Sequence, residues 1–125
     1  MKLLIVDDEE GILELFKDFF ELQKDPHFEV ILAKDGLDGF KKVETANPHC
    51  IVLDIKMPIR NGIEFYADLK KSGRQTPTIV FIDSTSPDEI AKIRRSGNPV
   101  LVEKSAHRSS MQEMLATIKK LVVFA

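Results

Sequence analysis

Short apolar runs that alternate with helical patterns constrain the fold of this 125-residue chain more than any other feature. Runs of this kind, without the polar alternation of a half-exposed strand, are typical of strands buried on both faces of a parallel sheet. Right-handed crossovers between successive parallel strands favour a doubly wound α/β sheet that is covered by helices on both faces. The five runs span residues 2–6, 28–33, 50–53, 78–82 and 99–102.

Helical periodicity fills the segments between these strands. In the first helix, at about residues 11–24, apolar side chains recur at helical spacing and form one face, made of Ile12, Leu15, Phe16, Phe19 and Leu22. Asp25-Pro26 ends this helix, because proline disfavours helical backbone in the residue before it. Ser86 is expected to cap the fourth helix, with Pro87 at its first position. The other helices are expected from Gly36 to about Ala46, from Ile63 to Lys71, and from Ser109 or Ser110 to about Leu121.

Composition and charge fit one globular domain that spans residues 1–125. Apolar residues make up 43% of the chain and charged residues 30%, and the length leaves room for a proper core. The net charge of −2 gives no general attraction to nucleic acid or to an anionic membrane, and no apolar run approaches the roughly 20 residues of a membrane span. The chain leaves no room for a secretory signal before the first strand, and its one cysteine, Cys50, lies in a predicted core strand. We therefore expect a cytoplasmic protein without an internal disulfide.

Charged side chains follow three of the five strands at the point where each ends. Asp7 and Asp8 follow the first strand, Asp54 follows the third, and Lys104 follows the fifth after Glu103. Ligands of open parallel sheets bind at the carboxyl ends of the strands, so these side chains are expected at one edge. Three crowded carboxylates repel one another unless a cation joins them. A hard divalent cation with oxygen ligands, together with the Lys104 ammonium, would satisfy this arrangement.

Each of these residues alone has a simpler explanation. The acids at positions 7–10 lie where a helix begins, and acids there interact favourably with the helix dipole. Asp54 alone could end a strand in a turn, and Lys104 alone could be a solvated surface residue. Their coincidence at three strand ends is more specific than any one of them, and it favours a shared site.

Taken together, these residues resemble the receiver domain of two-component response regulators over nearly the whole chain. The matching positions are Asp7-Asp8, Asp54 within Leu53-Asp54-Ile55-Lys56-Met57-Pro58, Gly62 and Lys104. The resemblance implies a flavodoxin-like sheet in the order 2-1-3-4-5 and a single receiver domain with no effector domain. It also implies that Asp54 accepts a phosphoryl group from a histidine kinase or a phosphotransfer protein.

The same resemblance assigns roles to the other site residues. Mg²⁺ would be held by Asp8, by Asp54 and by the backbone carbonyl of Lys56, with Asp7 acting mainly through a bound water. Lys104 would pair with the phosphoryl oxygens. A downstream protein would bind the fourth helix, fifth strand and fifth helix. The chain would be a monomer or weak dimer that binds neither nucleic acid nor membrane, and not an enzyme beyond its own phosphorylation and dephosphorylation.

Three positions depart from the family pattern. The usual Thr or Ser at the end of the fourth strand falls on Ile82, which cannot donate a hydrogen bond, and Ser84 would replace it only with a local bulge or shifted loop. The aromatic switch position of the fifth strand falls on Leu101, and the usual proline after Lys104 is Ser105. An altered output switch is therefore expected.

Other function classes remain open. A pseudo-receiver would keep the fold and act as a phosphorylation-independent protein-interaction module, as Ile82, Leu101 and Ser105 suggest. A Mg²⁺-dependent phosphohydrolase would commonly carry a second Asp two residues after the nucleophile, where this chain has Lys56. A flavodoxin-like cofactor binder would need a phosphate-cradling loop after the first strand, and none is present.

Overall fold

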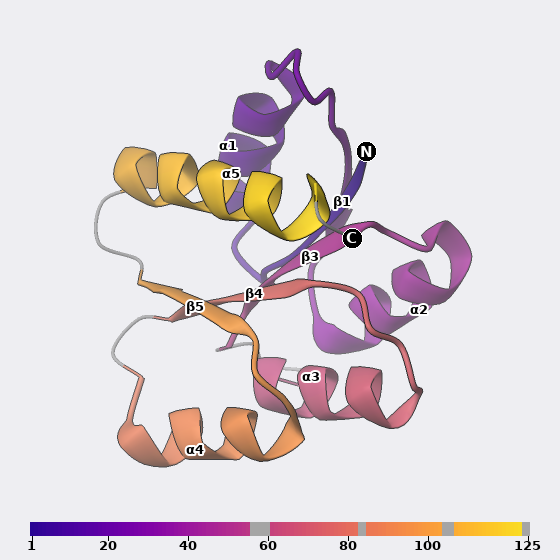
Figure 1. Cartoon of the computed structure of the whole chain (residues 1–125), viewed down its shortest axis with the longest axis vertical. Helices are drawn as coiled ribbons and strands as arrows, with labels where there is room; N and C mark the ends of the chain where they lie inside the picture. The colour runs from indigo at the N-terminus through magenta and orange to yellow at the C-terminus, as the bar shows by residue number, and fades with distance from the viewer. Residues whose placement is uncertain (56–60, 83–84, 104–106, 124–125) are drawn as a thin grey trace.

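Five strands and five helices alternate along the chain (Figure 1). The computed structural model describes residues 1–55, 61–82, 85–103 and 107–123. The strands are β1 (Lys2–Val6), β2 (Glu29–Ala33), β3 (Cys50–Asp54), β4 (Thr78–Ile82) and β5 (Val100–Glu103). The helices are α1 (Glu10–Glu21), α2 (Gly36–Ala46), α3 (Gly62–Lys71), α4 (Pro87–Ser96) and α5 (His107–Val123).

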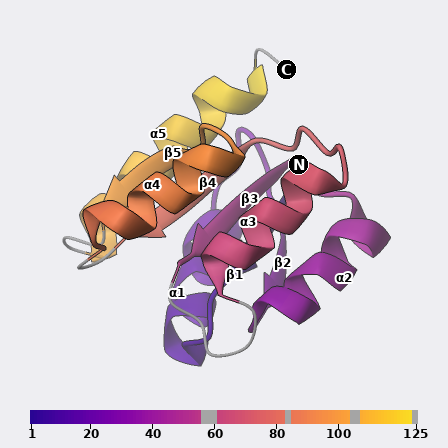
Figure 2. The same ribbon diagram turned by 90° about the horizontal axis from the view of Figure 1, so that it is seen from below.

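The strands form one parallel sheet in the order β2-β1-β3-β4-β5, which confirms the predicted doubly wound, flavodoxin-like fold. Helices α1 and α5 cover one face, and α2, α3 and α4 cover the other (Figures 1 and 2). β2 and β5 are the edge strands, so β1, β3 and β4 lie inside the sheet. Burial on both faces explains why these three strands are apolar at nearly every position.

Alternation of side chains along each strand divides the core between the two faces. In β1, Leu3 and Ile5 face α1 and α5, whereas Leu4 and Val6 face the other helices. The core on the α1 side contains aromatic pairs: Phe16 meets Phe81 edge-on with ring centroids 5.6 Å apart, and Phe20 meets Phe28 at 5.4 Å. By the same alternation, Asp7 and Asp54 continue the rows that face α1 and α5.

The buried face of α1 differs from the one that the sequence predicts. Leu13, Phe16 and Phe20 are buried, whereas Leu15 is 41% exposed and Leu22 is 77% exposed. The helix ends at Glu21, with Leu22 as its cap, and a turn bridged between Lys24 and His27 follows. Apolar residues make up half of this helix, and the large rings of Phe16 and Phe20 determine which part enters the core, because they have aromatic partners there.

Side-chain caps define the starts of three helices. Asp35 accepts from the Asp38 N–H at 2.8 Å, and Asn61 accepts from the Glu64 N–H at 3.0 Å. Ser86 and Glu89 form the complete capping box, which confirms the predicted start of α4. The predicted start of α5 at Ser109 or Ser110 is wrong, since this helix begins at His107.

None of the helices in the described ranges is both long enough and apolar enough to cross a membrane.

Candidate functional site

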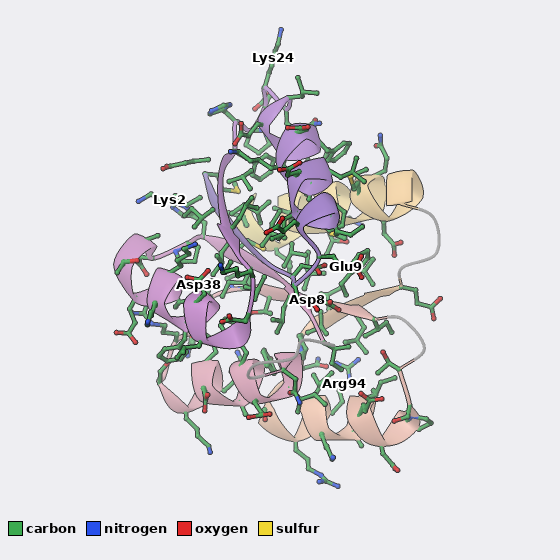
Figure 3. All side chains as sticks on the ribbon, turned by 180° about the vertical axis from the view of Figure 1, so that it is seen from behind. Lys2, Asp8, Glu9, Lys24, Asp38 and Arg94 are labelled. Carbon is green, nitrogen blue, oxygen red and sulfur yellow. The ribbon has the colours of Figure 1, made fainter. Side chains whose placement is uncertain are left out.

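Neighbouring strands place acidic side chains at one edge of the sheet. Asp7 directly follows β1 and Asp54 ends β3, and these two strands pair in register up to Val6 and Leu53. One carboxylate oxygen from each of Asp7, Asp8 and Asp54 lies within 4.8 Å of the other two. Figure 3 labels Asp8 beside Glu9, where the chain passes from β1 to α1. We call Asp7, Asp8 and Asp54 the carboxylate trio.

Burial differs sharply within the carboxylate trio. Asp7 is 1% exposed and Asp54 is 4% exposed, whereas Asp8 is exposed to solvent. The backbone holds Asp7 in place: its N–H donates to the carbonyl of Ala33, and its Oδ1 accepts from the Glu9 N–H, both at 3.0 Å. Two carboxylates are therefore fixed inside the protein, and the third opens the group to solvent.

α3 supports the backbone of Asp54 from the side. The Gly62 N–H donates to the carbonyl of Ile55 at 3.0 Å. A Cβ added to Gly62 would collide with the Asp54 carbonyl oxygen and would lie 2.6 Å from the Ile55 Cα. Glycine is therefore needed here for close approach of two backbones. The end of β3 cannot move toward α3 without moving that helix.

The donor chemistry of the carboxylate trio fits a hard divalent cation. Magnesium is usually held by a few carboxylates and keeps several waters, and the exposed side of Asp8 leaves room for solvent. Three carboxylates so close together carry mutual repulsion that such an ion would relieve. Among the described residues, these are the only three His, Cys, Asp or Glu side chains grouped closely enough to hold a metal ion.

The remaining predicted site residues divide into two groups. Ile82 and Leu101 are partly buried and pack against the core beneath α2, α3 and α4. Ile82 ends β4 next to the edge that carries Asp54, and its side chain offers no hydrogen-bond donor there. Lys56, Ser84, Lys104 and Ser105 lie outside the described residues.

Two further polar groups near the sheet need an explanation. Cys50 is fully buried, as predicted, and burial raises the pKa of its thiol to about 12, so it is not a nucleophile at neutral pH. The Thr85 hydroxyl, three residues past β4, is buried and has no hydrogen-bond partner in the described part of the chain. Nothing in the sequence predicts this buried hydroxyl, because Thr85 has the residue type and position of an ordinary loop residue before a helix cap.

The chain is similar to proteins of one family. It matches the family model of the response regulator receiver domain over residues 3–116. It is 38% identical over 88 residues to the alkaline phosphatase synthesis transcriptional regulatory protein PhoP of Bacillus subtilis. The aligned residues cover 70% of this chain and 34% of that protein. It is 35% identical over 128 residues to protein-glutamate methylesterase/protein-glutamine glutaminase 2 of Koribacter versatilis, covering 95% of this chain and 34% of that one.

Solved structures share the whole fold. The response regulator domain of Thermotoga maritima CheB superposes with a TM-score of 0.84 at 27% identity, covering 98% of this chain and 96% of that chain. The receiver domain of the Francisella response regulator 1452 superposes with a TM-score of 0.82 at 26% identity, covering 97% and 95%. The chain spans about a third of the length of the curated relatives it matches.

Proposed function

Because this chain belongs to the response regulator receiver domain family, we propose that it is a phosphorylation-dependent module of two-component signalling with Asp54 as its phosphoacceptor. The observation that carries the proposal is the carboxylate trio, which joins a buried Asp54 to a second buried acid and to a solvent-facing one. The phosphodonor would be a histidine kinase or a phosphotransfer protein.

The metal requirement of the reaction follows from charge. Asp8 and Asp54, with the backbone carbonyl of Lys56 by family resemblance, would hold Mg²⁺, and Asp7 would act mainly through a bound water. Bound there, the ion would neutralise the negative charge that otherwise repels an incoming phosphoryl group. Lys104 would supply a compact positive charge to the phosphoryl oxygens, as lysine does in other phosphate sites.

The transfer step itself needs one carboxylate nucleophile. A carboxylate oxygen of Asp54 forms the new bond to phosphorus while the bond between phosphorus and the donor breaks, and the donor leaves with that electron pair. The product is a mixed anhydride of a carboxylic and a phosphoric acid. Attack by water later returns the carboxylate and inorganic phosphate, so the signal is temporary and the chain is not a turnover enzyme.

The output side of the proposal is atypical. Ile82 provides no hydroxyl to the phosphoryl group, and Leu101 provides no aromatic ring to rotate. A downstream protein would bind the face formed by α4, β5 and α5, with the chain itself a monomer or weak dimer. A cytoplasmic setting is part of the proposal, in keeping with one buried reduced cysteine.

Intact-protein mass after incubation with acetyl phosphate and Mg²⁺ tests the proposal. The expected result is the addition of one phosphoryl group that is lost on standing and is prevented by a chelator. Asp54→Ala should stay unmodified, whereas Asp35→Ala, which removes a carboxylate from the cap of α2, should be modified like the unaltered chain. A chain that gains no mass, or gains it equally in Asp54→Ala, would contradict the proposal.

A pseudo-receiver is the second candidate. Ile82 and Leu101, both packed partly into the core, favour it, because neither position carries the group expected to sense a phosphoryl. In that case the chain would bind its partner equally well with and without phosphodonor. Partner capture from solution with the unaltered chain and with Asp54→Ala, each in the presence of acetyl phosphate, separates the two candidates.

A further inference from the structure

Tyr66 is a buried polar ring in α3 that the proposed phosphoryl chemistry does not use. It is 2% exposed and belongs to the core beneath α2, α3 and α4. Its hydroxyl lies against Gly97, the residue that ends α4. A Cβ added to Gly97 would collide with the Tyr66 hydroxyl oxygen and would lie 3.2 Å from the ring carbon that bears it. The contact between α3 and the end of α4 therefore has no free space.

Two positively charged side chains, Lys70 and Arg94, act on the Tyr66 side chain. The Lys70 Nζ lies 5.4 Å from the ring centroid, within the range of a cation–π interaction. Burial raises the pKa of the Tyr66 hydroxyl, and the charge of Arg94 offsets part of that effect. The hydroxyl is thus neutral at physiological pH, and it lies against the end of α4 while the ring stays close to the Lys70 ammonium of its own helix.

The start of the same helix, one turn before Tyr66, packs against the candidate phosphoacceptor. Gly62 begins α3 and packs against the Asp54 carbonyl, also without room for a Cβ. Tyr66 lies four residues after Gly62, so the two positions share one side of the helix. The first turn of α3 therefore connects the backbone of Asp54 to the end of α4, with a tight contact at Gly62 and another one turn later at Tyr66.

The end of α4 is in turn fixed to the start of β5. Arg94 donates to the side chain of Asn98 and to the carbonyl of Pro99, the latter at 3.1 Å. The Gly97 N–H closes the helix by donating to the Ile93 carbonyl at 3.3 Å. α3 and α4 lie side by side on one face of the sheet (Figures 1 and 2). A displacement at Gly97 would thus also move Asn98 and Pro99, which directly precede β5.

We propose that α3, through Tyr66, transmits the state of Asp54 to the junction of α4 and β5, here defined as residues 97–101. This inference rests on the proposed function, since a phosphoryl group at Asp54 is the event to be transmitted. Close-packed contacts without slack pass on a small shift of the strand end instead of absorbing it. The route needs no hydrogen bond from β4, which Ile82 cannot provide, and no aromatic side chain at Leu101.

Backbone amide NMR of the full chain with Mg²⁺ and beryllofluoride, an unreactive phosphoryl mimic, tests the route. In the unaltered chain, shifts are expected both around Asp54 and at the junction. Tyr66→Phe keeps the ring and removes only the hydroxyl. It should leave the beryllofluoride midpoint at Asp54 within about twofold and reduce the shifts at the junction by at least about half. Ser72→Ala, which removes a hydroxyl from the end of the same helix, is the matched control and should respond fully.

The outcomes separate this inference from the proposed function. A chain with no shift at any residue refutes phosphoryl binding at Asp54, and the route with it. If Tyr66→Phe shows shifts around Asp54 and its shifts at the junction are as large as in the unaltered chain, the route is refuted but the proposed function is not. A loss of junction shifts in Tyr66→Phe but not in Ser72→Ala supports it.

A second measurement tests the contact without any ligand. Gly97→Ala should lower the melting temperature, because its Cβ meets the Tyr66 hydroxyl, and the drop should shrink in the Tyr66→Phe background. Gly11→Ala, where nothing lies within 4 Å of the new Cβ, controls for the substitution type. Equal drops in both backgrounds would show that the hydroxyl does not contact Gly97, which removes the basis of the route.

Discussion

Gly62 packs directly against the backbone carbonyl of Asp54, with no room for a side chain between them. This contact makes the position of the candidate phosphoacceptor depend on α3, which in sequence belongs to the following segment. A hydrogen bond from the Gly62 N–H to the Ile55 carbonyl fixes the same approach at 3.0 Å. The end of β3 and the start of α3 are thus one structural unit.

Gly62→Ala should destabilise the chain by about 2 kcal/mol or more, because the new Cβ would lie 2.6 Å from the Ile55 Cα and against backbone that cannot rotate away. Urea unfolding at equilibrium measures this. Gly11→Ala, in α1 with open space around its Cβ, should instead stabilise by about 0.5–1 kcal/mol. Equal effects of the two substitutions would contradict the close approach.

Thr85→Val should be neutral or should stabilise the chain by up to about 1 kcal/mol, because it removes a buried hydroxyl that has no partner in the described part of the chain. Thr78→Val, at the start of β4, is the control for removal of a hydroxyl that has a partner. Its hydroxyl donates to the Thr76 carbonyl at 3.0 Å in a buried position, so its removal should cost about 1 kcal/mol. Thermal unfolding of both variants makes the comparison, and a larger loss at Thr85 than at Thr78 would show that the Thr85 hydroxyl is bonded.

Lys42→Met should weaken the edge of the sheet. The Lys42 ammonium donates to the Leu32 carbonyl at 2.5 Å and to Asp38 at 3.2 Å, and Leu32 belongs to the edge strand β2. Methionine keeps most of the apolar stem but leaves that carbonyl without its donor, so we expect a loss of about 0.5–1 kcal/mol and more self-association. Light scattering and urea unfolding check both effects.

Lys17→Met is the control for the loss of a helix-surface lysine. Its only ion pair among the described residues is with Glu21 at 4.0 Å, and both side chains are more than 40% exposed. Such pairs contribute little, so its stability should change by less than about 0.5 kcal/mol. If Lys17→Met costs as much as Lys42→Met, the bond to the edge strand has no special role.

Alkaline pH should destabilise the chain through Cys50. Burial raises the pKa of this thiol from 9.0 to about 12, so above pH 9 the folded chain keeps a proton that the unfolded chain has lost. The free energy of unfolding therefore falls as pH rises from 9 toward 12 and is insensitive to this group below pH 9. Urea unfolding across this range should show a shallower fall in Cys50→Ala, although Tyr66, whose pKa burial also raises, keeps part of it. An identical slope in Cys50→Ala would contradict burial of the thiol.

Strand positions and strand ends could be predicted from the sequence because they depend on patterns that are local in the chain, whereas the strand order followed only from the family resemblance. The apolar runs mark the strands, and the side-chain alternation that places Leu3 and Cys50 on one face also carries Asp7 and Asp54 to that face. The gathering of these two carboxylates follows from the pairing of β1 with β3.

Features that depend on tertiary packing could not be predicted. Half of the residues of α1 are apolar, and only the aromatic partners Phe81 and Phe28 decide that Phe16 and Phe20 are buried and Leu22 is not. The contact between Tyr66 and Gly97 joins residues 31 positions apart, with no shared motif to mark it. A buried hydroxyl without a partner, as in Thr85, likewise leaves no trace in residue type or spacing.

The uneven burial of the carboxylate trio has a consequence for how fast such a site could be loaded. An ion held there would enter and leave past Asp8, since the other two acids are sealed beneath the sheet edge. Because Asp8 faces solvent in the described part of the chain, exchange with dissolved magnesium would be quick compared with folding motions. The fraction of sites that hold the metal, and are thus able to accept a phosphoryl group, would then follow the free Mg²⁺ concentration closely in time.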